Sequence, residues 1–149
     1  MQLSLTRSNN GGLTAMTPRA ILLIQENRMR IFKNNFFNKF AKKMGLQDEA
    51  LKTAIAEISS GLYEANLGGH LFKKRIGLKG KGKRGGLRTI IAFKKDDKAF
   101  FVYGFAKNEK ANIDETEKKI YKELASLLLS YSDKDVAVAL KNKKFIEVL

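Results

Sequence analysis

The feature that most constrains this chain is a basic, glycine-interleaved stretch that cannot belong to a hydrophobic core. Residues 73–88 hold eight Lys or Arg side chains in sixteen positions, and no Asp or Glu occurs from Ala65 to Lys95. This window carries +10 of the formal net charge of +14. Because unpaired charge is too costly to bury, the window is predicted to be a surface for polyanions, above all phosphates.

Composition excludes several classes of protein. The chain has no Cys and one His, and the basic window has no carboxylates, so disulfides, a zinc site, a Cys nucleophile and a two-metal nuclease centre are not expected. The Gly-x-Gly run around Gly80 lacks the Gly-Lys-Ser/Thr ending of a Walker loop. The apolar runs are far shorter than the roughly 20 residues of a membrane-spanning helix. We therefore expect a cytoplasmic protein without metal, cofactor or membrane anchor.

The chain is predicted to hold one domain, because its 149 residues leave little room for two cores. Residues 1–28 look different from the rest, with a turn-like segment at 8–12 and Pro18 before a short apolar run at 20–24. We expect this leader to be poorly packed. A single domain is predicted over 29–149, and Met29 is a candidate for the true start.

Apolar periodicity predicts two helices near the start of this domain. After a strand at 29–33, Asn34 or Asn35 is expected to cap a helix that Gly45 ends, and a second helix begins at Asp48. Their predicted buried faces are Phe36, Phe37, Phe40, Ala41 and Met44 in the first helix and Leu51, Ala54, Ile55 and Ile58 in the second.

Strand patterns dominate the middle of the chain. Residues 87–93 and 99–105 are rich in β-branched and aromatic side chains and are separated by a short turn. They are predicted to pair as an antiparallel hairpin at the centre of the sheet. A weaker strand is expected at 70–76, and residues 79–86 are predicted to form a flexible basic loop.

The remaining sequence predicts a long helix, a short helix and an edge strand. Asn112 with Glu115 is expected to cap the long helix, Ser132 begins a short helix around 136–140, and residues 145–148 form the strand. The predicted apolar side of the long helix is Ile113, Ile120, Leu124, Leu127, Leu128 and Tyr131. This order predicts an α+β domain with helices against an antiparallel sheet.

Two motifs carry a family resemblance: Gly-Lys-Gly-Lys-Arg-Gly-Gly-Leu-Arg-Thr-Ile at 80–90 and Phe-Val-Tyr-Gly-Phe-Ala-Lys-Asn-Glu at 101–109. From about Met29 onward the chain resembles the RelE/HigB-like toxins of type II toxin-antitoxin systems, in the RelE/ParE superfamily. The resemblance implies a RelE-like fold, with two N-terminal helices and a C-terminal helix packed on a twisted antiparallel sheet. It also implies a cognate antitoxin protein, from the adjacent gene, that neutralises the basic face.

The resemblance leaves more than one activity open. Members of the superfamily include ribosome-dependent mRNA endoribonucleases, which inhibit translation, and ParE-type poisons of DNA gyrase. Our leading prediction is an mRNA-cleaving toxin with ribosome and mRNA as partners. The alternatives are a gyrase inhibitor and a non-enzymatic RNA-binding module that uses the same basic surface.

Without metal ligands, the chemistry that remains is metal-free RNA cleavage, in which the ribose 2′-hydroxyl attacks the adjacent phosphate. Arg88, at the start of a strong strand, is the first candidate to stabilise the developing phosphorane charge through its planar guanidinium. Tyr103 is a candidate for stacking on a base or for proton transfer. Alternatively, Tyr103 is a core aromatic residue with a buried partner for its hydroxyl.

Lysines are further candidates. Lys81 and Lys83 lie two residues apart, and a pKa about 3 units below the usual 10.4 would make one of them a base at neutral pH. Lys107 is a candidate general acid or phosphate clamp. The lone His70 is an alternative general base, although a lone His is more often a structural residue. The residues expected to position phosphates are Lys73, Lys74, Arg75, Lys79 and Arg84.

Overall fold

A mixed six-stranded sheet organises the computed structural model, which describes residues 5–7, 13–15, 17–19, 29–78 and 82–149, with the backbone alone for 5–7, 13–15 and 82–85. Across the sheet the strands lie in the order β4 (Ala65–Gly68), β5 (Leu71–Leu78), β6 (Gly82–Lys94), β7 (Lys98–Ala106), β3 (Arg30–Asn34) and β8 (Phe145–Val148). The helices of this domain are α2 (Asn35–Met44), α3 (Asp48–Ser59), α4 (Glu115–Leu129) and α5 (Asp133–Lys141).

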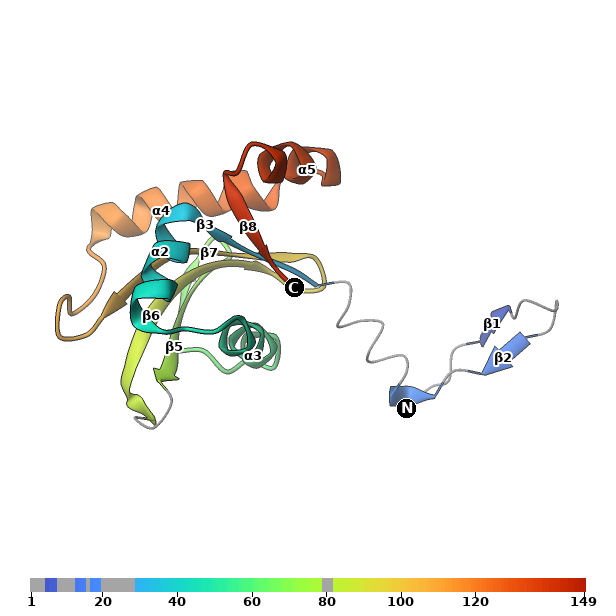
Figure 1. Cartoon of the computed structure of the whole chain (residues 1–149), viewed down its shortest axis with the longest axis horizontal. Helices are drawn as coiled ribbons and strands as arrows, with labels where there is room; N and C mark the ends of the chain where they lie inside the picture. The colour runs from blue at the N-terminus through green and yellow to red at the C-terminus, as the bar shows by residue number, and fades with distance from the viewer. Residues whose placement is uncertain (1–4, 8–12, 16, 20–28, 79–81) are drawn as a thin grey trace.

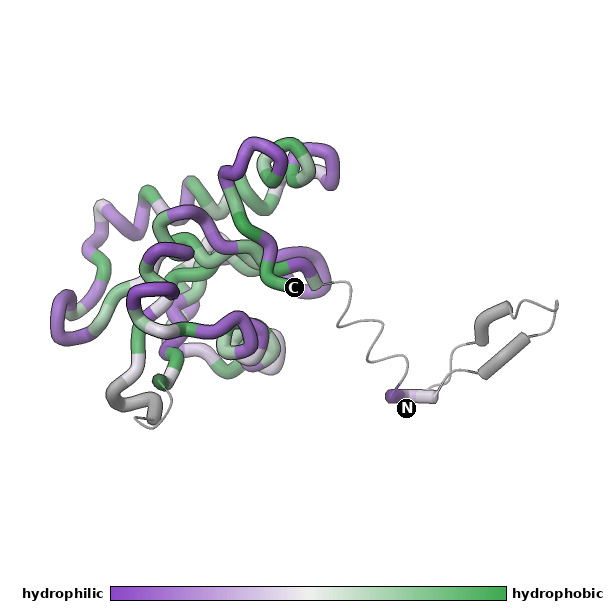
Figure 2. The backbone as a smooth tube through the Cα atoms, viewed as in Figure 1, coloured by the Kyte–Doolittle hydropathy of each residue, from purple (hydrophilic) through white to green (hydrophobic). Residues whose placement is uncertain are grey.

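Helices cover both faces of the sheet (Figure 1). On one face α2 and α3 pack with a cluster that includes Ile91 and Phe101, and on the other α4 and α5 pack with Ile90 and Phe100. Neighbouring residues of one strand therefore belong to different cores, as the alternation of side chains across a strand requires. Figure 2 shows the result, with hydrophobic residues along the central strands and hydrophilic residues at the turns.

The two N-terminal helices form as predicted. The side chain of Asn34 accepts a hydrogen bond from the Phe37 amide at 2.8 Å, and Gly45 ends α2 with a φ of +72°. In α3 the predicted stripe of Leu51, Ala54, Ile55 and Ile58 is buried. One prediction is wrong: Phe36 is 55% exposed and lies outside the core.

The central hairpin of β6 and β7 is confirmed, but β6 is longer than predicted. It begins at Gly82, so residues 82–86 are strand rather than loop, and Leu78 of β5 pairs with Gly82. The strand passes close to its neighbour at Gly86, where a Cβ atom would lie 2.2 Å from the backbone oxygen of Ile76. Glycine lets the two backbones approach there. The rest of the predicted loop, residues 79–81, lies outside the described residues.

The sheet is mixed rather than antiparallel, because β3 pairs with β7 in parallel. Parallel neighbours need a long connection, and here α2, α3 and three strands intervene. Apolar patterning marks strands without their direction, so the sequence did not reveal this pairing. The short edge strand β4 was also missed, and His70 lies exposed with a φ of +63° in the turn between β4 and β5.

The C-terminal elements follow the prediction with two corrections. The capping box of α4 is Asp114 with Glu117, two residues beyond the predicted pair. Ile120 and Leu127, predicted on the apolar side, are 56% and 54% exposed. The capping box at Ser132, helix α5 and the edge strand β8 are confirmed.

Within the leader, β1 (Leu5–Arg7) and β2 (Leu13–Ala15) pair with each other as an antiparallel two-stranded sheet. The segments 8–12 and 20–24 lie outside the described residues, and the boundary at Met29 stays a prediction. Among the described residues, no helix combines the length and apolar character needed to cross a membrane.

Replacing Gly86 with Ala should lower the free energy of unfolding by at least about 2 kcal/mol, because the new Cβ would meet the Ile76 carbonyl rather than a side chain that can move. Gly61→Ala is the matched control: its φ is +86° but the space around it is open, so about 1 kcal/mol is expected. Chemical denaturation measures both, and equal losses would contradict the close approach of β5 and β6.

Candidate active site

Two arginines lie side by side on neighbouring strands. Arg75 of β5 and Arg88 of β6 are directly opposite in the antiparallel register, and Phe105 of β7 is opposite Arg88 on the other side. The strand alternation places these side chains on the α4 face, with Ile90 and Phe105. Like charges directly opposite each other destabilise a sheet, so this pair requires a compensating negative charge.

Glu64 supplies that charge. Its Oε2 lies 3.3 Å from Arg88 Nε, and its Oε1 lies 3.7 Å from both Arg75 Nη2 and Lys73 Nζ. The Glu64 amide donates to the Lys73 carbonyl at 2.9 Å, which fixes the carboxylate beside β5. We call these four residues the arginine cluster. Sequence reasoning missed Glu64, which stands one position before the acid-free window.

The arginine cluster retains unused hydrogen-bond donors. Among the described residues, Arg75 Nε and Arg88 Nη1 are buried and have no acceptor. A buried donor without a partner costs about 1–3 kcal/mol, and the oxygens of a phosphate are acceptors that fit a guanidinium. The arrangement is therefore suited to an oxyanion that binds beside Glu64.

Arg88 is not the surface residue that the sequence indicated. Its side chain is 6% exposed, whereas that of Arg75 is 36% exposed. The burial arises because β6 begins at Gly82 rather than at 87, so Arg88 lies inside the strand and next to the buried Phe105. Arg75 is thus the arginine that an incoming ligand meets first.

Tyr103 is the middle ring of an aromatic stack. Its centroid lies 5.2 Å from that of Phe36 and 5.3 Å from that of Tyr121, with interplanar angles of 24° and 25°. Tyr103 is half-buried, so it is neither a fully enclosed core residue nor a ring free on both faces. Its ring faces contact other protein rings, and its hydroxyl interacts with Lys110.

Lys110 is a second residue that sequence reasoning missed. Its Nζ lies 5.5 Å from the centroid of the Tyr103 ring and 2.5 Å from Glu117 Oε2. The hydrogen bond to Glu117 raises the pKa of Lys110, so this ammonium stays protonated. Burial, together with the neighbouring Tyr103, raises the pKa of the Tyr121 hydroxyl. Lys107, the predicted candidate, is exposed in the turn that follows β7.

The remaining predicted residues separate into three groups. Lys73 belongs to the arginine cluster and also donates to Asn112 Oδ1 at 3.3 Å. Lys74 points to the other face of the sheet, where its buried Nζ lies 3.1 Å from Glu57 and donates to the Leu62 carbonyl, which argues against a phosphate contact. For the rest, the structure gives only the backbone of Lys83 and Arg84 in β6, and Lys79 and Lys81 lie outside the described residues.

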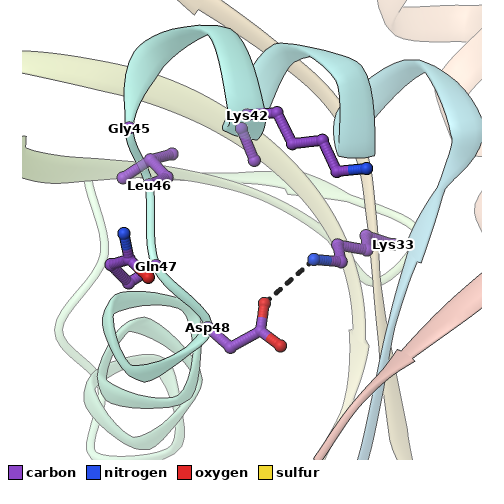
Figure 3. A pocket seen from close by; sticks show the side chains of 7 residues that line it. Lys33, Lys42, Gly45, Leu46, Gln47 and Asp48 are labelled. Carbon is purple, nitrogen blue, oxygen red and sulfur yellow. Dashed lines mark hydrogen bonds and ion pairs between the residues drawn. The ribbon is translucent and has the colours of Figure 1, made fainter.

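A pocket on the α2/α3 face lacks the features of a catalytic site (Figure 3). Its volume is about 450 Å³, and it lies between the end of α2 and the start of α3. Lys33 Nζ points across it to Asp48 Oδ1 at 2.9 Å, so these two charges satisfy each other. Nor does any group of three His, Cys, Asp or Glu side chains suited to a metal occur among the described residues.

The α+β domain thus holds two arginines and a carboxylate together and keeps two buried guanidinium donors without a partner, an arrangement suited to a phosphate group. Residues 29–148 match the family model described as the RelE toxin of the RelE/RelB toxin-antitoxin system. The chain therefore belongs to the RelE toxin family, and the predicted family and fold class are confirmed. No curated protein matched the chain.

Membership of this family defines the general activity. RelE toxins are ribosome-dependent mRNA endoribonucleases of type II toxin-antitoxin systems, and they inhibit translation. The RelE/RelB system also implies a cognate antitoxin as partner. The match favours the mRNA-cleaving prediction over the gyrase-directed alternative.

Arg88→Ala should lower the free energy of unfolding by about 1–3 kcal/mol, because it empties a buried position and removes the nearest cation of Glu64. Arg75→Ala should cost less than about 1 kcal/mol, because that side chain is partly solvated and its contact with Glu64 is longer. Urea titration of both variants measures the difference, and a larger loss for Arg75→Ala would contradict the described burial.

Proposed function

We propose that the arginine cluster cleaves mRNA by metal-free transphosphorylation. The ribose 2′-oxygen bonds to the adjacent phosphorus, the bond from phosphorus to the 5′-oxygen breaks, and the products are a 2′,3′-cyclic phosphate and a 5′-hydroxyl. One observation carries the proposal: a carboxylate, Glu64, lies 3.3 Å from a guanidinium that keeps an unused donor. The reaction needs these two functions, a proton acceptor and a stabiliser of phosphate charge.

In this proposal Glu64 is the general base. Its carboxylate lies beside the Arg88 guanidinium and offers oxygens that can take the 2′-hydroxyl proton. Lys81 or Lys83 would need a pKa lowered by about 3 units to do the same. In this proposal the two lysines instead serve as phosphate contacts, together with Lys79 and Arg84.

Arg75 and Arg88 stabilise the transition state in this proposal. Arg75 is the more exposed of the two and contacts the scissile phosphate first. The buried Arg88 Nη1 donates a hydrogen bond to the same phosphate. Groups that stabilise an oxyanion typically contribute about 3–4 kcal/mol to catalysis. The candidates to protonate the leaving 5′-oxygen are the Tyr103 hydroxyl, within β7, and Lys107, just beyond the end of that strand.

The partners follow from the same surface. We propose that the cations around the β5–β6 hairpin hold mRNA and ribosomal RNA, and that the protein acts in the cytoplasm. The cognate antitoxin, in this proposal encoded by the adjacent gene, masks the arginine cluster with acidic groups or by displacing a neighbouring helix. Residues 1–28 are dispensable for cleavage, a proposal that the family match from residue 29 supports.

Glu64→Gln should reduce single-turnover cleavage on programmed ribosomes by about 10²- to 10⁴-fold, because the amide keeps the size of the side chain but cannot accept the proton. Ribosome binding should persist, since the cations remain. Asp48→Asn is the matched control, because Asp48 also pairs with a lysine but on the opposite face; it should cleave at the parental rate.

Two results would contradict these assignments. If Glu64→Gln cleaves at the parental rate, Glu64 is not the general base. Lys81 or Lys83 is then the candidate for that role. If the parental protein inhibits DNA supercoiling by gyrase and leaves ribosome-bound transcripts intact, the nuclease reading of the site is wrong.

A further inference from the structure

We infer that Phe36 is a stacking platform for a nucleobase beside the scissile phosphate, and that it thereby contributes to the choice of cleavage site. This inference rests on the proposed function and adds a substrate contact that lies outside the arginine cluster. It concerns a residue that the hydrophobic pattern of α2 assigned to the core.

The position of Phe36 is unusual among the phenylalanines of the domain. Phe32, Phe37, Phe100 and Phe101 are fully buried, whereas Phe36 is 55% exposed. An isolated exposed apolar residue needs no special explanation. Phe36, however, is not isolated, because its ring stacks on Tyr103 with a centroid distance of 5.2 Å.

Phe36 is also held rigidly. It is the second residue of α2, whose N-cap Asn34 accepts from the Phe37 amide and donates from Nδ2 to the Val102 carbonyl at 2.9 Å. These bonds join the start of α2 to β7. Tyr103 is braced in turn by Tyr121 at 5.3 Å. A ring fixed on a helix and backed by two more rings is pre-organised for stacking, because little conformational freedom remains to be lost.

The stack leads directly to the arginine cluster. Arg88 is opposite Phe105 in the sheet register, and the Phe105 ring lies 5.8 Å from that of Tyr103. β3 pairs with β7 only as far as Phe101, so α2 takes the place of a strand beside the second half of β7. Arg88, Phe105, Tyr103 and Phe36 therefore follow one another across β6, β7 and the start of α2.

This row matches what a single-stranded RNA offers. Its phosphates are acceptors for guanidinium groups, and its unstacked bases pack on aromatic rings. With the scissile phosphate at Arg75 and Arg88, a neighbouring base extends along this row toward Phe36. Tyr103 is already stacked on protein rings, so Phe36 is the member of the stack that offers an exposed ring surface.

The experiment compares Phe36→Leu and Phe36→Trp with the parental protein on programmed ribosomes, together with Leu127→Ala as a control. Leu127 is 54% exposed on α4, so the control removes a similarly exposed apolar side chain away from this row. We expect Phe36→Leu to raise the protein concentration for half-maximal cleavage about tenfold to a hundredfold. Phe36→Trp should match or exceed the parental protein, and Leu127→Ala should behave like it.

A second readout reports the stacking itself. A ribosome-bound RNA that carries 2-aminopurine next to a 2′-deoxy scissile nucleotide should lose fluorescence on binding the parental protein and Phe36→Trp, but not Phe36→Leu. Unchanged quenching and cleavage with a folded Phe36→Leu would overturn the inference while the proposed function stands. A parental protein that cuts no RNA would overturn both.

Discussion

The contact between the Glu64 carboxylate and the cations of Lys73, Arg75 and Arg88 is the interaction on which this site depends. Arg75 and Arg88 face each other across two strands, an arrangement that repels without an acid. Glu64 sits at 3.3 Å from Arg88 and leaves two guanidinium donors unused. The same carboxylate thus offsets the repulsion between the two arginines in the folded state. In our proposal it is also the general base for the reaction whose transition state the arginines stabilise.

The fold places this cluster by covering both faces of one sheet. Lys74 lies on the α2/α3 face, where it forms an ion pair with Glu57. The sheet separates it from the two arginines. The α4 face keeps Arg75 and Arg88 and brings the segment before α4 close, where Asn112 meets Lys73. Because alternate residues of β5 point to opposite faces, a continuous run of basic residues becomes one paired lysine and one cluster with unused donors.

Local signals made much of this fold predictable, and long-range ones did not. The cap at Asn34, the stop at Gly45 and the central hairpin depend on neighbouring residues, so the sequence was sufficient for them. The parallel pairing of β3 with β7, and the approach of Glu64 to Arg88, join residues distant in sequence. The absence of Asp and Glu from residues 65–95 therefore described the charge of the hairpin correctly. It did not reveal that Glu64, just outside that range, lies beside Arg88. Phe36 was misplaced because helical periodicity does not show where a neighbouring sheet ends.

The proposed chemistry is tested directly by single-turnover cleavage of a ribosome-bound mRNA in which only the nucleotide 5′ to the scissile phosphate carries a 2′-deoxy sugar. We expect cleavage at this phosphate to stop, and the all-ribose message to yield a 2′,3′-cyclic phosphate end. Cleavage of the deoxy message at the same position and the same rate would contradict the proposed chemistry, because the nucleophile would then not be the 2′-hydroxyl that Glu64 is proposed to activate.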